Sequence, residues 1–176
     1  MQKLKPVLIL FCLVIFSSAT LKSGSNEKIN WLNFGDISAK VKEQSKPVII
    51  DLYTDWCHWC KVMDKKTYSN SKVIEYLNEH FYSAKINAET RDTIHWKNKI
   101  YKYNDKYRIN DFTLFLTYGR AAFPTTVIIA DEKSAPIPIS GYMEPKQLEP
   151  ILKYFGEGAY KTMNYPAFEK TFKSTW

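Results

Sequence analysis

The chain has 176 residues, of which 45% are hydrophobic and 15% aromatic, as in a globular domain and unlike a disordered chain. Its net charge of +7 comes from scattered lysines without a nucleic-acid-binding motif, which argues against a nucleic-acid partner. Three cysteines are too few for a fold held together by several disulfides.

The N-terminus has the three parts of a secretory signal peptide. Lys3 and Lys5 precede ten apolar residues at 7–16, and small residues follow at 17–19. Ten apolar residues are too few to span a bilayer, so cleavage after residue 19 is favoured over the alternative, an N-terminal membrane anchor. The sequence therefore predicts a mature chain that starts near Thr20, in an exported, periplasmic and disulfide-permissive space.

Helix and strand patterns alternate along the rest of the chain. Residues 20–32 predict a flexible lead-in, and residues 157–176 predict a C-terminal tail. Helices are predicted at 33–46 with Asp36 as N-cap, from the cysteine pair to about 66, at 71–80, and at 145–155 with Gly156 at its end. Strands are predicted at 48–53, 81–88, 124–130 and 137–142. This order predicts an α/β fold with a mixed central sheet flanked by helices.

Residues 89–120 form an insertion that is longer than a minimal connection between two strands. Within it, 94–96 and 100–101 flank Lys97-Asn98-Lys99, which predicts a hairpin. Residues 110–118 predict a helix that ends at Gly119.

The stretch TDWCHWCK at 54–61 holds both cysteines of the expected mature chain, Cys57 and Cys60. It joins a predicted strand to a predicted helix, so the amide N–H groups of the helix N-terminus point at the first sulfur and favour its thiolate. Cys60 lies on the same helical face, close enough to form a disulfide. This pattern predicts thiol–disulfide exchange rather than a structural staple, because so small a loop contributes little stability.

Two charged residues interrupt the apolar strands near this pair. Asp51 stands in VIIDLY, where an isolated buried carboxylate is costly, and Lys85 stands in FYSAKINA. Either one alone fits a solvent-facing position. Together they suggest a buried pair in which Asp51 accepts the proton of the Cys60 thiol.

With these residues, the chain resembles the thioredoxin-like superfamily, in particular exported bacterial proteins with a W-C-x-x-C-K motif. The resemblance rests on 48–61, AKIN at 84–87, FPTTVII at 123–129 and SGY at 140–142, and it covers about residues 33–156. It implies a thioredoxin fold without a cofactor or a bound metal, and a protein disulfide oxidoreductase activity.

The same resemblance implies roles for single residues. Cys57 corresponds to the nucleophile, Cys60 to the resolving thiol, and Asp51 with Lys85 to the buried proton-relay pair. Pro124 corresponds to the cis-proline beside the disulfide. The expected client-binding residues are Trp56, His58, Trp59, Phe123 and Pro124.

The chain departs from standard thioredoxins in two places. His58-Trp59 stands between the cysteines instead of Gly-Pro, and the insertion at 89–120 is longer. Because Asp55 and Asp51 oppose a thiolate at Cys57 whereas His58 and Lys61 favour it, we expect a reductant or disulfide shuffler rather than a strong oxidant. We expect a monomer whose partners are exported proteins with disulfides or thiols and a membrane electron donor.

Two other functions use the same residues. Cys57, His58 and Cys60 offer ligands for copper or zinc, although a closed zinc site needs four and His80 and His95 stand alone. The aromatics Trp56, Trp59, Phe123 and Tyr118 would also suit a thioredoxin-fold module that binds clients without turnover.

Overall fold

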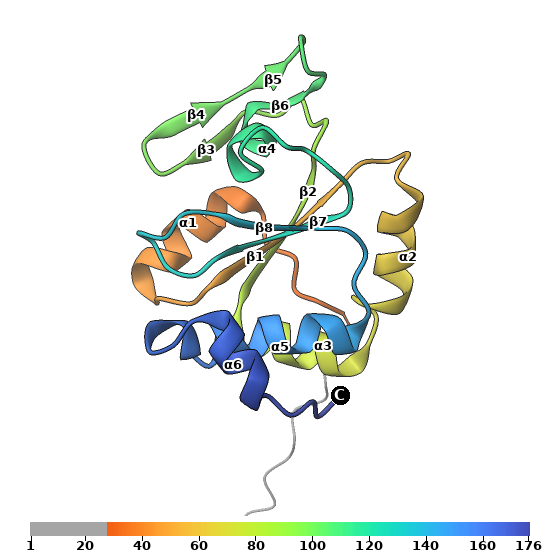
Figure 1. The fold of residues 1–176 in the computed structure, drawn as a ribbon. Helices are drawn as coiled ribbons and strands as arrows, with labels where there is room; N and C mark the ends of the chain where they lie inside the picture. The colour runs from red at the N-terminus through yellow and green to blue at the C-terminus, as the bar shows by residue number, and fades with distance from the viewer. Residues whose placement is uncertain (1–27) are drawn as a thin grey trace, which may run out of the picture.

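The computed structural model describes residues 28–176, which fold around one central sheet (Figure 1). The expected signal peptide and residues 20–27 of the expected lead-in lie outside the described residues. The helical elements are α1 (Phe34–Glu43), α2 (His58–Lys66), α3 (Ser71–His80), α4 (Asp111–Leu116), α5 (Pro145–Gly156), η1 (Ala159–Lys161) and α6 (Tyr165–Thr171). The strands are β1 (Val48–Tyr53), β2 (Tyr82–Asn87), β3 (Ile94–Trp96), β4 (Lys99–Tyr101), β5 (Tyr103–Asn104), β6 (Ile109–Asn110), β7 (Thr125–Ile129) and β8 (Ile137–Ser140).

The central sheet has four strands in the order β2-β1-β7-β8. β1 runs parallel to β2 and antiparallel to β7, and β8 runs antiparallel to β7. The mixed sheet that the sequence predicts is confirmed. β1 is buried along almost its whole length, as its apolar, β-branched sequence predicts for a strand covered on both faces.

Alternate residues of β1 face opposite sides of the sheet. Val48, Ile50 and Leu52 pack in one hydrophobic cluster with residues of α1 and α4, whereas Ile49 packs in a second cluster with residues of α2, α3 and α5. Asp51 is two residues from Ile49, so its side chain lies on the same face of the sheet. The acid therefore lies on the side of the sheet covered by α2, the helix that begins at the cysteine pair.

The insertion folds as two small hairpins and a short helix. β3 pairs with β4, which confirms the predicted hairpin, while the β5–β6 pair was not predicted. The ring of Trp96 lies 5.0 Å from that of Phe34, so an aromatic contact joins the insertion to α1. Within the insertion, Tyr101 packs against Phe112 of α4 at the same distance. Figure 1 shows the insertion, α4 included, at one end of the sheet, away from α3 and α5.

The N-cap of α1 differs from the prediction. The side chain of Asn33, not that of Asp36, accepts a hydrogen bond from the amide of Gly35, at 3.0 Å. Asp36 lies in the first turn, where its negative charge is favourable near the helix N-terminus.

The helix α5 ends at Gly156, one residue beyond the predicted range of 145–155. Two residues later, Gly158 has a positive φ. A Cβ atom on Gly156 would lie 2.7 Å from the hydroxyl of Tyr76, so the glycine lets α5 approach α3 closely.

Residues before α1 contact the sheet edge. Ile29 is buried, Trp31 forms a parallel bridge with Ser83, and the amide of Leu32 donates to the carbonyl of Ser83 at 2.8 Å. Within residues 28–176, none of the helices has the length and apolar character needed to cross a membrane.

Candidate active site

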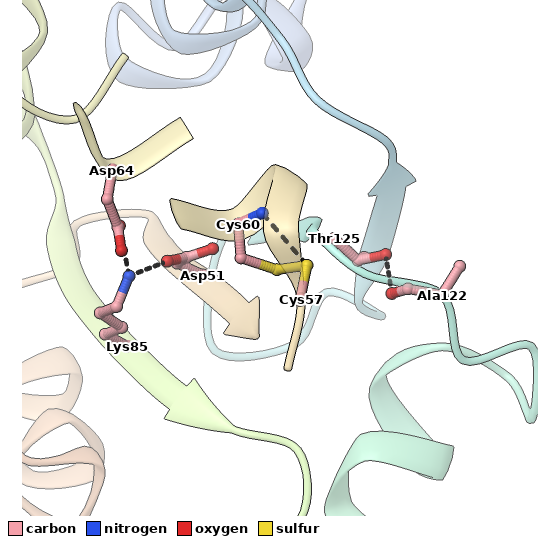
Figure 2. Close-up of a disulfide and its surroundings, with 7 residues drawn as sticks. All are labelled: Asp51, Cys57, Cys60, Asp64, Lys85, Ala122 and Thr125. Carbon is pink, nitrogen blue, oxygen red and sulfur yellow. Dashed lines mark hydrogen bonds and ion pairs between the residues drawn. A yellow bond between two sulfur atoms is a disulfide. The ribbon is translucent and has the colours of Figure 1, made fainter. Parts of the chain in front are cut away.

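The Cys57–Cys60 disulfide lies at the first turn of α2 (Figure 2). Cys57 is the N-cap residue, and its Sγ accepts a hydrogen bond from the amide of Cys60 at 3.1 Å. The amide of Cys57 in turn donates to the carbonyl of Thr54 at 3.2 Å, which closes the turn between β1 and α2. The first sulfur therefore sits where helix amides stabilise a thiolate once the disulfide is reduced.

Exposed aromatic side chains border a largely covered disulfide. Cys57 and Cys60 are 4% and 3% exposed, whereas the adjacent Trp56 and Trp59 are 68% and 56% exposed. The two sulfurs are thus covered, while the indole rings next to them in the sequence are open to solvent.

An ion pair between a buried acid and a partly buried lysine lies beneath the disulfide. Asp51 is 2% exposed and faces Lys85 in the register of β1 and β2, with Lys85 Nζ donating to Asp51 Oδ2 at 2.6 Å. Figure 2 shows one carboxylate oxygen of Asp51 toward Lys85 and the other toward the disulfide. Burial raises the pKa of Asp51 to about 6 even though Lys85 lowers it. The carboxyl group can thus take up a proton near neutral pH.

A second carboxylate, Asp64 on α2, was not predicted. Lys85 Nζ donates to Asp64 Oδ1 at 2.5 Å and also lies 4.8 Å from the centre of the Tyr53 ring. Burial lowers the pKa of Lys85, but the two carboxylates outweigh burial and raise it. The available sequence signal was the acid four residues after Cys60, one turn along the same helix.

The proline expected beside the disulfide precedes β7. The Phe123–Pro124 peptide bond is cis, and the carbonyl of Pro124 accepts a hydrogen bond from the amide of Gly141 at 2.8 Å. A shallow cavity of about 360 Å³ is lined by Trp59, Phe123, Pro124, Gly141 and Tyr142. Three of the five residues expected from the sequence to bind clients, Trp59, Phe123 and Pro124, thus line one cavity. Gly141 and Tyr142, which also line it, were not predicted as site residues.

Two aromatic pairs lie at this cavity and next to it. Trp56 packs edge-on against Phe123 with ring centres 6.1 Å apart, and Trp59 lies 5.5 Å from Tyr142. His58 is exposed beside Trp59. Tyr118, which the sequence grouped with these aromatics, donates its hydroxyl to the carbonyl of Pro136 and does not line the cavity.

Two hydrogen bonds tie the loop before Cys57 to the end of β2. Trp56 Nε1 donates to Glu89 Oε1 at 3.1 Å, and Asn87 Nδ2 donates to Asp55 Oδ2 at 3.1 Å. The start of the insertion therefore positions the indole beside the disulfide.

The chemistry that these side chains offer is disulfide exchange. Within residues 28–176, no group of three or more His, Cys, Asp and Glu side chains is arranged to hold a metal ion. The two sulfur atoms are bonded to each other, an acid of raised pKa lies behind them, and Trp59, which stands between the cysteines in the sequence, lines an apolar cavity.

The family model described as "Thioredox_DsbH: Protein of unknown function, DUF255" matches residues 12–156. The chain is 31% identical over 78 residues to the uncharacterized protein B0495.5 of Caenorhabditis elegans, which covers 44% of this chain and 11% of that protein. It is 57% identical over 50 residues to the thiol:disulfide interchange protein DsbD of Yersinia pestis (strain Pestoides F), which covers 28% of this chain and 8% of that protein. The chain thus spans about a tenth of the length of these curated relatives.

Solved structures share the fold. A DsbH oxidoreductase superimposes with a TM-score of 0.54 at 16% identity, covering 79% of this chain and 89% of that one. A thioredoxin-fold protein from Helicobacter pylori gives a TM-score of 0.53 at 20% identity, covering 71% and 83%. With the thioredoxin fold, the Cys57-x-x-Cys60 disulfide and a family match over residues 12–156, the chain belongs to the Thioredox_DsbH (DUF255) family.

Proposed function

We propose that this chain is a thiol–disulfide oxidoreductase that reduces or rearranges disulfides of exported proteins through Cys57 and Cys60. The observation that carries the proposal is the disulfide at the start of α2, with the buried Asp51–Lys85 pair behind it. The matching segment of relatives named thiol:disulfide interchange protein supports the same chemistry.

The reaction starts from the reduced dithiol. The Cys57 thiolate attacks one sulfur of a client disulfide, the client S–S bond breaks, and a mixed disulfide forms while the other client sulfur leaves as a thiolate and takes a proton from water. The Cys60 thiol then loses its proton, and its sulfur attacks Cys57, which releases the second client thiolate. One client disulfide gains two electrons, and the Cys57–Cys60 disulfide re-forms.

Asp51 is the proposed acceptor of the Cys60 proton. Its carboxyl group is buried, points toward the disulfide, and has its pKa raised to about 6. A base whose pKa lies near the working pH can both accept a proton from the thiol and return it to solvent. Lys85 keeps the ionised carboxylate in place between turnovers.

The aromatic cavity is the proposed client site. Trp59, Phe123 and Pro124 line it with few polar atoms, and Trp56 and His58 border the disulfide, so a client segment gains apolar contact while its disulfide approaches Cys57. The electrons consumed in each cycle must come from a second dithiol, for which we propose a membrane-bound donor on the exported side.

Insulin, a small protein with accessible disulfides, tests the proposal. The reduced full-length chain should release insulin thiols in proportion to the protein added, and Cys57→Ser should abolish this release. Cys60→Ser should stop at a mixed disulfide that is visible by mass under non-reducing conditions. Tyr107→Ala, at a 55% exposed site in the insertion, is the matched control and should reduce insulin normally. A wild-type chain that leaves insulin oxidised would overturn the proposal.

A further inference from the structure

A third charged group joins the Asp51–Lys85 pair. Lys85 Nζ donates at 2.6 Å to Asp51 and at 2.5 Å to Asp64, so one ammonium group is shared by two carboxylates. The Asp51 side chain is 3% exposed, that of Lys85 23% and that of Asp64 43%. The cluster therefore runs from the buried acid to solvent, and it has a net charge of −1 when all three groups are ionised.

We propose that Asp64 is a positioning residue for proton transfer from Cys60: it shares the Lys85 ammonium group with Asp51, so that Lys85 keeps a carboxylate partner while Asp51 gains and loses a proton. This inference rests on the proposed function, because it concerns the step in which the resolving thiol is deprotonated.

The physical reason lies in what happens to Lys85 during that step. When Asp51 takes the proton, it loses its negative charge and holds the ammonium group less strongly. A partly buried ammonium group without an anionic partner is costly. Asp64 still contacts the ammonium group, so Lys85 does not have to move before Asp51 returns its proton to solvent.

Sharing the Lys85 ammonium group with Asp64 also keeps the pKa of Asp51 high. An ammonium group bound to one carboxylate stabilises that carboxylate's ionised form fully, whereas here Asp64 takes part of the interaction and adds its own negative charge nearby. Both effects favour the protonated form of Asp51. They agree with a pKa of Asp51 that burial raises, that Lys85 lowers and that Asp64 raises.

The other groups around the ammonium are aromatic or uncharged. The rings of Tyr53, Trp31 and Tyr68 lie 4.8, 5.7 and 5.9 Å from Lys85 Nζ. Tyr68 stays neutral because burial raises its pKa well above the usual range, and its hydroxyl contacts Thr126 of β7 at 3.3 Å. The cysteines of α2 carry no charge as a disulfide. In this part of the described chain, Asp51 and Asp64 are thus the two anions that contact Lys85.

Titration of the Asp51 carboxyl carbon by NMR tests the inference in the oxidised full-length chain. Asp64→Asn keeps an oxygen that can accept from Lys85 but removes the charge, so the Asp51 midpoint should fall by roughly half to one pH unit. Asp64→Glu should restore most of the wild-type midpoint. Asp55→Asn is the matched control, because this acid binds Asn87 and not Lys85, and it should leave the midpoint in place.

A double-mutant cycle shows whether Asp64 acts through Lys85. In a Lys85→Met background, Asp64→Asn should shift the Asp51 midpoint by less than it does in the wild type. An unchanged or raised midpoint in Asp64→Asn, or equal shifts in both backgrounds, would overturn the inference.

Kinetics connect this titration to catalysis and separate the two proposals. In single turnover with insulin, Asp64→Asn should slow release from the mixed disulfide about threefold, because a weaker base removes the proton more slowly, and should leave formation unchanged. An equal slowing of both steps would count against a role in resolution. If the wild type fails to reduce insulin, the proposed function is wrong, while the NMR cycle still decides whether Lys85 is shared.

Discussion

Asp51 and Lys85 stand opposite each other in the parallel ladder of β1 and β2, with their charged atoms 2.6 Å apart. Their neighbours in the same ladder, Leu52 and Ile86, pack on the other face of the sheet. Because side chains alternate along a strand, a register shift of one residue would place the acid and the base on opposite faces. The strand pairing therefore holds the charged pair beneath the disulfide.

This placement predicts an asymmetric kinetic effect of Asp51→Asn. The variant should slow release from the mixed disulfide by about tenfold or more, because the Cys60 thiol loses its base. Formation of the mixed disulfide, which depends on the Cys57 thiolate, should change much less. Stopped-flow single turnovers with insulin measure both steps, and equal effects on them, or none, would show that Asp51 is only structural.

The same carboxyl group predicts how stability varies with pH. Its pKa is about 6 in the folded chain and near 3.8 when exposed, so the folded state binds the extra proton between these values. Relative to high pH, proton binding by Asp51 stabilises the folded state fully below about pH 4, and this stabilisation is lost as the pH rises through 6. At pH 8 the buried, ionised carboxylate therefore lowers the free energy of unfolding by roughly 3 kcal/mol. Asp51→Asn should therefore be more stable than the wild type at pH 8.

Urea denaturation of the oxidised proteins at pH 4, 6 and 8 measures this difference. The advantage of Asp51→Asn should shrink toward pH 4, where the wild-type carboxyl group is already neutral. A difference that stays constant across this range would contradict the raised pKa.

The central strands and α3 were predictable because each carries a strong local pattern of apolar residues. The run at 48–53 and the helix at 71–80 agree with the structure, and the strand at 81–88 is only slightly shorter than predicted. The β5–β6 hairpin was missed because two-residue strands show no periodicity.

The site residues were predictable where a residue type is unusual for the element that contains it. Asp51 and Lys85 stood out as charges in apolar strands, and the cysteine pair marked the start of α2. Asp64 and Tyr142 did not stand out, because an acid on an amphipathic helix and a tyrosine after a strand have ordinary surface roles. Their contribution arises from tertiary contacts that spacing alone does not reveal.

The position of Cys57 at the N-cap of α2 predicts an order of reaction for the two thiols. In the reduced chain the helix N-terminus acts mainly on Cys57, so its thiol should be the more acidic one. Brief treatment with iodoacetamide at mildly acidic pH, followed by peptide mass mapping, should find Cys57 labelled before Cys60. Preferential labelling of Cys60 would reverse the assigned roles.

A buried carboxylate far from the disulfide predicts a second stability effect. Glu149 on α5 is fully buried and accepts hydrogen bonds from Ser174, from both the amide and the hydroxyl of Thr175, and from Trp176. Burial raises the pKa of Glu149, but these hydrogen bonds outweigh burial and lower it. Glu149→Gln should therefore lower the free energy of unfolding at pH 7 by about 2 kcal/mol, as expected when charge-assisted hydrogen bonds are weakened.

Urea denaturation at pH 7 checks this value, with Glu157→Gln at an exposed position just after the same helix as the matched control. The loss should diminish as the pH falls and Glu149 in the wild type takes up a proton. Equal stabilities of Glu149→Gln and Glu157→Gln would mean that the C-terminal residues gain nothing from the buried carboxylate.

The charges near Cys57 predict the redox direction. A strong oxidant has a reduced form stabilised by a very acidic nucleophilic thiol. Here the helix N-terminus and the exposed Lys61 favour the Cys57 thiolate. Two carboxylates oppose it: Asp55, which lies two residues before Cys57 and accepts a hydrogen bond from Asn87, and the buried Asp51. The opposing charges place the reduction potential of the Cys57–Cys60 couple nearer that of a thioredoxin than that of a strong oxidant, at a value more negative than about −150 mV.

Equilibration with glutathione buffers and quantification of the Cys57–Cys60 disulfide measure this potential. Asp55→Asn removes an opposing charge and should make the potential less negative, because it stabilises the thiolate of the reduced form. A wild-type value less negative than about −150 mV would assign the protein to the oxidants.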